Sequence, residues 1–309
     1  MFSDLKICII GDGTHSKRIQ NILKKKKIAF TIFKPISKKR YKLENIDHLK
    51  KNDAIFIISP DHTHCHYVKK LYKFCYIFCE KPPCNNTKDL KNLLKIKSNK
   101  IYYNFNFRFS KISEILKHKE RYKLGNLIYA NIIDGHGLGL KKEYKDSWRS
   151  KIKETNKGIL EIVTIHWIDL INFLFKIKKI EKPKLINLSK YGNSYDNSLT
   201  RIEINKKSFV DIFTSYTSPL IGKKNFVFEN GLLEQNYKEI IVKGPAINLD
   251  KNKFFKKPKV LKVVKYNNKS DAMYSLTKSV DYFLNIIINR KSFPKNEAKL
   301  ALLSNKYIL

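Results

Sequence analysis

The feature that most constrains the fold is a regular alternation of short apolar runs and amphipathic segments in the first third of the chain. The apolar runs, typical of strands buried on both faces, lie at 5–11, 28–33, 53–58, 74–79 and 101–105. Segments with apolar residues on one face separate them and predict helices that end near Lys27 and that span 64–73 and 87–97. Strands that alternate with helices through short connections predict an α/β fold with a parallel, doubly wound sheet.

The remainder of the chain has a different pattern. After a helix predicted over 158–175, strand-like runs follow one another with Asn-, Gly- and Lys-rich turns between them, at 184–189, 201–205, 208–213, 225–230, 239–244 and 260–266. Few helices separate these runs, so they predict a large, mostly antiparallel sheet in an α+β domain. Two more helices are predicted at 271–289 and 296–308. We therefore expect two domains, 1–103 and 104–309, with the C-terminal helices able to pack back on the first.

The formal charge of +36 suggests a nucleic-acid partner, because Lys and Arg neutralise phosphates. The distribution of the charge argues against that interpretation. Only seven of the 63 basic residues are Arg, the residue best suited to bidentate phosphate and base contacts. The lysines extend from Lys6 to Lys306 without gathering in one tail or helix. We expect no nucleic-acid partner, and interpret the charge as background that could help attract an anionic cofactor or substrate.

Three observations concern location. No apolar run reaches the ~18 uncharged residues of a transmembrane helix, so no membrane partner is expected. The start, MFSDLKICIIGDG, lacks the pattern of a secretory signal. Five cysteines, an odd number in a chain of 309 residues, do not form a disulfide framework. Together these features predict a cytoplasmic protein in a reducing setting.

A glycine-containing loop joins the first predicted strand to the first helix. It reads Gly11-Asp12-Gly13-Thr14-His15-Ser16, the context that a dinucleotide-binding turn requires. Gly11 permits the tight turn, and Gly13 lets the backbone approach a pyrophosphate at the positive end of the helix. Ser16 replaces the usual third glycine, so the motif is incomplete. The alternative is an ordinary strand–helix turn, but the surrounding alternation favours a Rossmann domain.

Lys34, at the end of the second strand, bears on which nicotinamide cofactor binds. A site for NAD usually places Asp or Glu about 20 residues beyond the glycines to bind the ribose hydroxyls. Lys34 stands there instead, with Lys38, Lys39 and Arg40 nearby. A cation suits the 2′-phosphate of NADP, although lysine is common everywhere in this chain. The sequence favours NADP slightly over NAD.

Several further motifs follow in order along the chain. They are Ser59-Pro60-Asp61-His62-Thr63-His64, Cys79-Glu80-Lys81-Pro82-Pro83, Tyr103-Asn104-Phe105-Asn106-Phe107-Arg108-Phe109, Leu124-Gly125-Asn126-Leu127, Trp148-Arg149, and the helix GILEIVTIHWIDLINFLF at 158–175. Each is loose alone. Their order and spacing resemble the glucose–fructose oxidoreductase / inositol dehydrogenase (Gfo/Idh/MocA) family, and the resemblance extends from residue 5 to the end of the chain.

The resemblance implies an NAD(P)-dependent oxidoreductase that transfers a hydride to or from a secondary alcohol or ketone of a sugar, cyclitol or sugar derivative. It implies a homo-oligomer, dimer or tetramer, formed through the second-domain sheet. It also implies cofactor-binding residues, namely Gly11, Gly13, Thr14, His15, Ser16, Lys34, Ser59, Pro60, His64, Glu80 and Lys81. The implied substrate-binding residues are Asn106, Arg108, Trp148, Arg149 and Asp169.

The resemblance assigns catalysis to two residues. Lys81 is expected at the carboxyl end of a parallel strand, where open α/β sheets bind ligands, and a cation there stabilises a developing alkoxide. His166 titrates near neutral pH and can accept and return the hydroxyl proton. Taken alone, Lys81 is better interpreted as a surface lysine and His166 as a histidine packed on an apolar helix; the motifs around them favour the catalytic roles.

One position departs from the family pattern. Many members carry an acidic residue four positions before the histidine, where this chain has Ile162. On a regular helix Asp169 shares a face with His166, whereas Glu161 is rotated away and reaches the site only if the helix begins irregularly. The departure leaves open a second function, a catalytically silent NAD(P)-binding sensor or partner protein.

A cluster of His62, His64, Cys65 and His66, followed by Cys75, Cys79 and Cys84, invites a metal-binding interpretation. Neither Cys-x-x-Cys nor His-Glu-x-x-His spacing is present. Cys75 and Cys79 fall in or at the end of a predicted buried strand, where Cys behaves as a small apolar residue. We expect no metal site.

Overall fold

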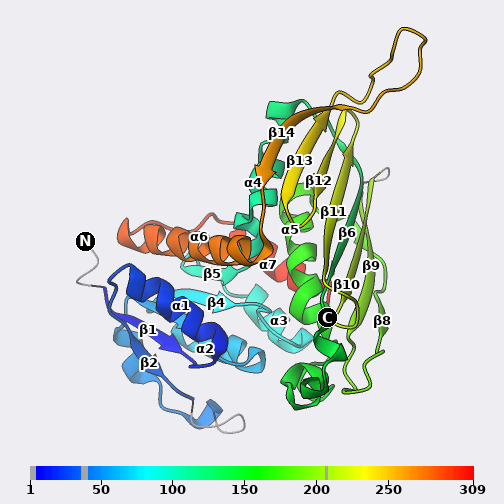
Figure 1. Ribbon diagram of the computed structural model, residues 1–309. Coiled ribbons are helices and arrows are strands. Elements are labelled where there is room, and N and C mark those ends of the chain that lie inside the picture. Colours follow the sequence, from blue (N-terminus) through cyan, green and yellow to red (C-terminus); the bar gives the residue numbers. More distant parts are fainter. Residues whose placement is uncertain (1–4, 36–40, 206–207) are drawn as a thin grey trace. The chain divides into compact units, whose positions relative to one another are not determined.

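The first apolar runs form a five-stranded parallel sheet in the order β2-β1-β3-β4-β5, so the predicted α/β architecture is confirmed (Figure 1). The computed structural model describes residues 5–35, 41–205 and 208–309. The strands are β1 (Ile7–Ile10), β2 (Thr31–Phe33), β3 (Ala54–Ile57), β4 (Tyr76–Glu80) and β5 (Ile101–Asn104). Four of them, β1, β3, β4 and β5, are almost fully buried, which explains their uninterrupted apolar runs, whereas the short edge strand β2 is largely exposed.

Three helices connect these strands: α1 (Thr14–Lys25), α2 (His64–Leu71) and α3 (Thr87–Leu94). The second strand is shorter than the predicted run 28–33. Lys27 has a left-handed backbone (φ 56°), and the Ile28 N–H donates to Leu23 O at 3.0 Å. Ile28 therefore belongs to the turn that ends α1, and the strand begins three residues later.

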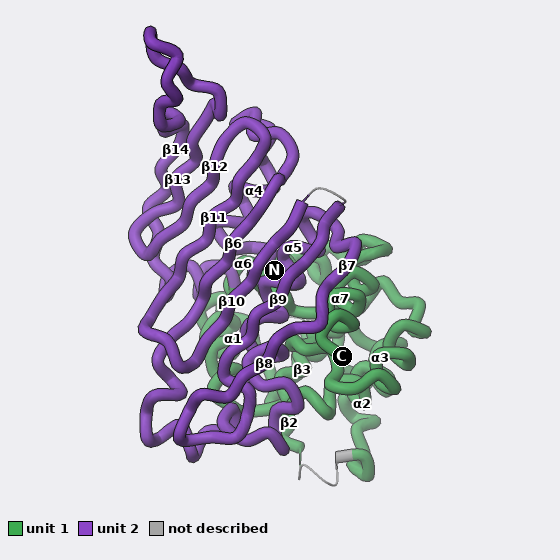
Figure 2. The backbone as a smooth tube through the Cα atoms, turned by 90° about the vertical axis from the view of Figure 1, so that its right-hand side faces the viewer, with its two compact units in different colours: residues 1–106, 276–309 green, residues 107–275 purple. Residues whose placement is uncertain are grey.

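The last part of the chain returns to this sheet. Phe283 of α6 (Asn268–Ile288) packs edge-on against Phe56 and Phe78, with ring centroids 5.1 and 5.3 Å away. The Ser279 and Tyr102 hydroxyls lie 2.6 Å apart, and α7 (Glu297–Lys306) contacts β5. The chain therefore divides into unit 1, residues 1–106 and 276–309, and unit 2, residues 107–275 (Figure 2). The division at 106/107 lies three residues beyond the expected boundary at 103/104, and the return of residues 276–309 is the packing of C-terminal helices that the sequence left open.

Unit 2 contains a nine-stranded sheet in the order β14-β13-β12-β11-β6-β10-β9-β7, with β8 paired to β9. Every pairing is antiparallel except that of β6 with β10, which confirms the predicted mostly antiparallel sheet. The strands are β6 (Leu127–Gly135), β7 (Lys179–Ile180), β8 (Lys184–Ile186), β9 (Asn197–Asn205), β10 (Ser208–Ser215), β11 (Ile221–Phe228), β12 (Gly231–Gln235), β13 (Glu239–Gly244) and β14 (Lys259–Lys265).

Helices cover one face of this second sheet, called here the inner face. They are α4 (Lys111–Lys117) and α5 (Ile165–Phe175), and α5 follows a π-helical turn at Leu160–Thr164. The Thr164 hydroxyl meets that of Thr214 on β10 at 2.7 Å, and the Trp167 indole N–H donates to Asp134 of β6 at 3.0 Å. Figure 2 shows strands without covering helices on the opposite, outer face of the described part of unit 2. Among the described residues, no helix combines the length and the apolar character needed to cross a bilayer.

Candidate active site

The two glycines of the loop after β1 differ in what surrounds them. Gly11 has a φ of +106°, and a Cβ atom there would lie 2.6 Å from the Ile58 carbonyl oxygen. Its N–H donates to Phe33 O at 2.9 Å, so the turn is pressed between β2 and the end of β3. Gly13 is the N-cap of α1 with extended backbone, and nothing lies within 4 Å of a Cβ built on it. The backbone conformation and the close packing therefore require glycine at position 11 but not at position 13. The space beside Gly13 is open to a ligand.

Ser16 takes the place of the third glycine by folding into the loop. It is fully buried, and its hydroxyl donates to Gly11 O at 2.8 Å while accepting from the Gln20 amide at 3.0 Å. Thr14 and His15 occupy the first turn of α1, which contains no acidic residue. A helix N-terminus whose N-cap is glycine has backbone N–H groups that no side chain caps, and these favour an anion. The loop therefore has the geometry of a phosphate site despite its departure from the three-glycine motif.

Lys34 lies beside this loop. Its ammonium forms a 2.8 Å ion pair with Asp12 Oδ2, and the side chain is otherwise largely exposed. The hydrogen bond from Lys34, followed by that from Gln20, lowers the pKa of Asp12. Lys38, Lys39 and Arg40, also considered for a 2′-phosphate, lie outside the described residues.

The carboxyl end of β4 brings together three predicted site residues. Glu80 is buried, and its Oε1 accepts from the Asn104 amide at 2.6 Å and lies 2.8 Å from His15 Nε2. Its Oε2 accepts from the Lys81 backbone N–H at 3.3 Å. Burial raises the pKa of Glu80, but His15, Asn104 and Lys81 outweigh that effect and the pKa is lowered overall. Glu80 therefore links the first turn of α1 to the residue that follows β4, the half-buried Lys81.

His64 connects the ends of β3 and β4. Its two ring nitrogens lie 2.8 Å from the carbonyl oxygens of Pro82 and Ser59. The Ser59 hydroxyl lies 2.6 Å from that of Thr63, which donates to Pro60 O at 2.7 Å. The ring of His64 is buried, so within unit 1 it holds the two loops of the predicted cofactor site in register.

Two predicted substrate residues of unit 2 pair with each other. The Arg108 guanidinium donates from Nε and Nη2 to the two Asp169 carboxylate oxygens, each at 2.7 Å, and both side chains are buried. The guanidinium also lies over the Phe173 ring, 5.0 Å from its centroid. This planar, bidentate geometry fixes the start of unit 2 to α5. Asn106 lies in the 3-10 turn Asn106–Phe109, half-buried, as the last residue of unit 1.

His166 lies at the start of α5, where its ring stacks on Phe107 with centroids 4.4 Å apart. The turn before it is not the regular helix that the periodicity predicts. The Ile165 N–H donates to Leu160 O, five residues back, as in a π-helix. Residues five apart approach the same face there, which brings the buried Glu161 toward the His166 face. The hydropathy pattern carried no signal of this turn, because both helix types bury the same apolar residues.

Trp148 and Arg149 lie in an aromatic region of unit 2. The Arg149 guanidinium lies 4.5 Å from the centroid of the half-exposed Trp148 ring, and the Tyr144 hydroxyl donates to Arg149 O. The ring of Tyr216 lies 5.0 Å from that of His136, which directly follows β6. Burial raises the pKa of Tyr216, and Arg149 partly offsets that rise. Sequence reasoning did not single out Tyr216 or His136; the position of His136 at a strand end was the available signal.

The described cysteines are free and buried. Burial raises the pKa of Cys65 and of Cys84 to about 12, and that of Cys75 to about 11. Thiols that resist ionisation are poor metal ligands. Within the described ranges, no group of three or more His, Cys, Asp or Glu residues is arranged to hold a metal ion.

Comparison with known proteins agrees with the geometry of unit 1. Residues 10–103 match the model of the GFO_IDH_MocA oxidoreductase family, which is described as an NAD-binding Rossmann fold. The chain's Rossmann domain belongs to the Gfo/Idh/MocA family. This Gfo/Idh/MocA domain is therefore an NAD-binding domain of an oxidoreductase family. A search of the curated proteins finds no match.

Solved structures extend the similarity in fold to both units of the chain. A putative NADPH-dependent oxidoreductase from Desulfitobacterium hafniense aligns with 100% of this chain and 94% of its own, at 15% identity and a TM-score of 0.77. An oxidoreductase from Agrobacterium radiobacter, in complex with NAD+, L-tartaric acid and magnesium, aligns with 98% and 94%, at 13% and 0.76. A myo-inositol dehydrogenase from Corynebacterium glutamicum aligns with 98% and 94%, at 16% and 0.70. At these identities the similarity establishes the two-unit fold.

Proposed function

We propose that the chain is an NAD(P)-dependent oxidoreductase that transfers a hydride between a nicotinamide cofactor and a secondary alcohol or ketone of a sugar, cyclitol or sugar derivative. The observation that carries the proposal is the junction of the Gly11–Gly13 loop with the His15–Glu80–Lys81 network in an NAD-binding domain. Solved structures of similar fold include a myo-inositol dehydrogenase and a levoglucosan dehydrogenase in complex with NADH and levoglucosan, which supports the sugar-like substrate class.

The residues present fit the cofactor on two counts. The space over Gly13 is open, and the N-terminus of α1 presents backbone N–H groups without a side-chain cap. In the proposal Gly11, Gly13, Thr14, His15 and Ser16 surround the pyrophosphate, while Ser59, Pro60, His64 and Glu80 form the adjoining wall. Lys34 would exchange its contact with Asp12 for a 2′-phosphate, which favours NADP slightly over NAD. When bound, the nicotinamide supplies the hydride acceptor or donor.

In the proposal, residues of the chain stabilise the charge on the substrate oxygen and transfer its hydroxyl proton. We assign Lys81 to polarise the substrate oxygen, because a nearby cation stabilises the charge that develops as the hydroxyl proton leaves. We assign His166 to accept that proton during oxidation and to return it during reduction. Each group contributes through its charge or proton, so the conservative replacements are Lys81→Met and His166→Gln.

We propose Glu161 as a positioning residue for His166. The i→i+5 register of Leu160–Thr164 brings Glu161 toward the same face as His166, which a regular helix would not do. A carboxylate beside an imidazole orients the ring and stabilises its protonated form. The π-helical turn would thus compensate for the apolar Ile162. Glu161→Gln should lower kcat about tenfold and shift the acidic limb of the pH profile to lower pH.

Other residues receive supporting roles. Trp148 and Arg149 offer a half-exposed stacked surface for a sugar ring, and Asn106 offers an amide. Arg108 and Asp169 are assigned to position α5, since both are buried in their own pair. We also propose that the outer face of the second sheet associates with a second copy to form a homo-oligomer, because Leu199 and Phe209 there are each more than 40% exposed.

The test compares turnover with cofactor binding. Lys81→Met and His166→Gln should each lower kcat by about 10²–10⁴-fold on a panel of polyols and sugars. Binding of NADPH and NADH, followed by nucleotide fluorescence, should persist in both. Lys88→Met, on the exposed surface of α3, is the matched control and should retain full turnover. Full turnover in both site variants would refute the roles, and cofactor binding without turnover by the parent protein would identify a silent cofactor-binding protein.

A further inference from the structure

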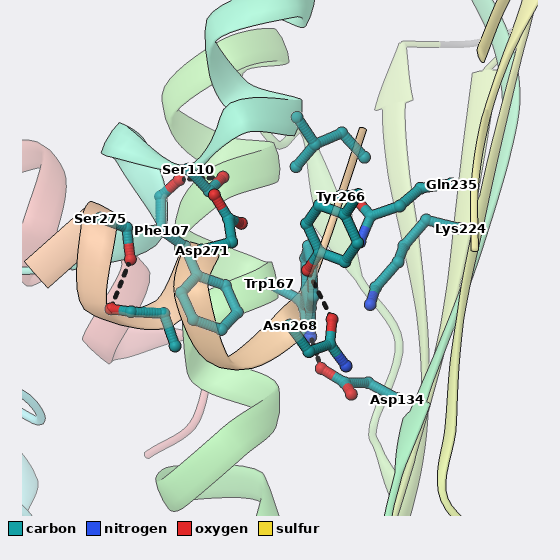
Figure 3. Close-up of a pocket in the computed structure, with 12 residues that line it drawn as sticks. Phe107, Ser110, Asp134, Trp167, Lys224, Gln235, Tyr266, Asn268, Asp271 and Ser275 are labelled. Atoms are coloured by element: carbon teal, nitrogen blue, oxygen red, sulfur yellow. Dashed lines mark hydrogen bonds between the residues drawn. The ribbon is translucent and has the colours of Figure 1, made fainter. Parts of the chain in front are cut away.

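A pocket lies entirely within unit 2, on the inner face of its sheet. Its volume is about 200 Å³, and it lies between β6, β11 and β12 on one side and α5 with the first turns of α6 on the other (Figure 3). The residues that the following argument uses are Asp134, Trp167, Lys224, Gln235, Asn268 and Asp271. Figure 3 shows Lys224 and Gln235 extending from the sheet toward the helix side of this space.

Gly222 of β11 is close to two of the lining residues, Asn268 and Lys224. A Cβ atom on Gly222 would lie 3.1 Å from the Asn268 amide nitrogen and 3.4 Å from the Lys224 ammonium. Any larger residue at this position would therefore enter the space between these two donors.

Lys224 is a deeply buried cation on the sheet side of the pocket. Its side chain is only 2% exposed, and among the described residues its ammonium makes neither a hydrogen bond nor an ion pair. It lies over the Trp167 ring, 5.0 Å from the centroid. Burial lowers the pKa of Lys224, and the more distant carboxylates of Asp134 and Asp271 partly offset that effect. A buried charge that lacks hydrogen bonds is costly, and a ligand oxygen would remove that cost.

Gln235 of β12, next to Lys224, is a second deeply buried polar side chain at the pocket. It is 2% exposed, and neither its amide nitrogen nor its amide oxygen has a hydrogen-bond partner in the described structure. Lys224 and Gln235 are directly opposite each other in the β11–β12 ladder, so their side chains emerge side by side on the inner face. The neighbouring Tyr266 hydroxyl donates to Asn268 Oδ1 at 2.5 Å, and its oxygen is near enough to the Gln235 amide that Gln235 partly offsets the rise of the Tyr266 pKa caused by burial.

We propose that this pocket binds a small, neutral, polyhydroxylated molecule. Lys224 and the Gln235 amide nitrogen are donors, while the Gln235 oxygen and Asp134 are acceptors, and a hydroxyl group can serve both kinds. Trp167 provides an apolar wall for the carbon face of such a ligand. Two carboxylates, Asp134 and Asp271, border the pocket and oppose a ligand with two negative charges.

This site is separate from the proposed catalytic histidine. His166 does not line the pocket, and the Phe107 ring, which does, stacks on His166 with one face. The inference therefore goes beyond the proposed hydride transfer and does not depend on it.

The experiment uses tryptophan fluorescence without any nicotinamide cofactor. The chain has two tryptophans, so Trp148→Phe leaves Trp167, in the pocket wall, as the only reporter. Sorbitol should produce a saturable change in emission, and L-tartrate should not. In the same background Lys224→Met and Gln235→Leu should each weaken sorbitol binding at least tenfold. Lys223→Met, the exposed neighbour on the same strand, is the matched control and should bind like the parent.

Three results would overturn the proposal: no saturable response to sorbitol, tighter binding of L-tartrate than of sorbitol, or parental affinity in both pocket variants. Thermal unfolding of each variant verifies that it folds, and Gln235→Leu provides an uncharged test if Lys224→Met does not. Because no hydride transfer is measured, the failure of this proposal leaves the proposed oxidoreductase activity untouched. The failure of that activity likewise leaves the sorbitol result valid.

Discussion

Each unit buries a charged side chain at its proposed ligand site, and the two charges are treated differently. Glu80 of unit 1 is 7% exposed, and its carboxylate contacts His15, the Asn104 amide and a backbone N–H. Lys224 of unit 2 is 2% exposed and has no such contact among the described residues. The comparison shows that the burial of a charged side chain does not by itself tell whether the side chain stabilises the fold or binds a ligand. A buried charge whose hydrogen bonds are all made within the protein joins segments of the fold. A buried charge that lacks hydrogen bonds is available to a ligand.

Unit 2 also contains a buried charge with hydrogen-bond partners, in the bidentate Arg108–Asp169 pair. Arg108→Met would leave Asp169 buried without its bidentate partner, so we expect a loss of about 3–5 kcal/mol in the free energy of unfolding. Urea denaturation followed by far-UV circular dichroism measures it. Arg201→Met, which removes the partner of Asp211 at an exposed pair, is the control and should change little. Equal losses in the two variants would show that burial does not distinguish these pairs.

The two glycines of the phosphate loop sharpen the comparison within unit 1. Gly11→Ala should cost about 3 kcal/mol, because the left-handed backbone and the Ile58 carbonyl both oppose a Cβ atom. Gly13→Ala should leave the stability of the cofactor-free protein within about 0.5 kcal/mol, since its Cβ enters open space. It should instead weaken binding of NADPH and NADH. Thermal unfolding and fluorescence titration separate the two effects, and a stability loss in Gly13→Ala would contradict the open site.

Glu80→Gln tests how much the hydrogen-bonded, buried carboxylate of Glu80 contributes to stability. At pH 7 we expect a loss of about 2 kcal/mol, because hydrogen bonds to a charged group are replaced by weaker ones. The folded-state pKa of Glu80 is lowered, so its contribution is complete above the unfolded-state pKa and disappears as pH falls through the folded-state value. The stability difference between parent and variant should therefore shrink below about pH 4. A difference that stays constant from pH 7 to pH 3 would indicate a purely steric effect.

Lys224→Met should have the smallest effect on stability, in spite of being the most deeply buried lysine position discussed. Removing a cation that lacks hydrogen bonds removes a desolvation cost, so the unfolding free energy should stay the same or rise by up to about 1 kcal/mol. Urea denaturation at pH 7 checks this without any added ligand. A loss comparable to that of Arg108→Met would break the comparison, since it would show that Lys224 has a structural partner.

The sequence predicted the parallel sheet well, because strands buried on both faces appear as uninterrupted apolar runs. It also identified most strands of the second sheet, although β6, β7 and β12 were not among the predicted runs and the strand order was not predictable. The β6–β10 parallel pairing depends on contacts between residues about 80 apart, which local patterns do not encode. The start of β2 was predicted three residues too early, because Ile28 is buried in the turn that closes α1 and not in the strand.

For the site, local motifs indicated Gly11, Glu80 and Lys81, which adjoin strand ends. The π-helical turn at Leu160–Thr164 left no trace in the hydropathy pattern, so the sequence left open whether Glu161 reaches the His166 face through an irregular helix start. Lys224 was hidden by composition, because one buried lysine among 56 is indistinguishable from its exposed neighbours in a sequence. Its role becomes visible only when burial and the absence of a partner among the described residues are known.

The return of residues 276–309 to unit 1 has a consequence for synthesis on the ribosome. The sheet face that carries Phe56 and Phe78 emerges early, but Phe283, which covers it, follows only after all of residues 107–275. At about 5–20 residues per second that delay is on the order of 10–30 s. During this interval the nascent chain exposes the sheet face that carries Phe56 and Phe78. We expect a chaperone to bind to this exposed aromatic surface.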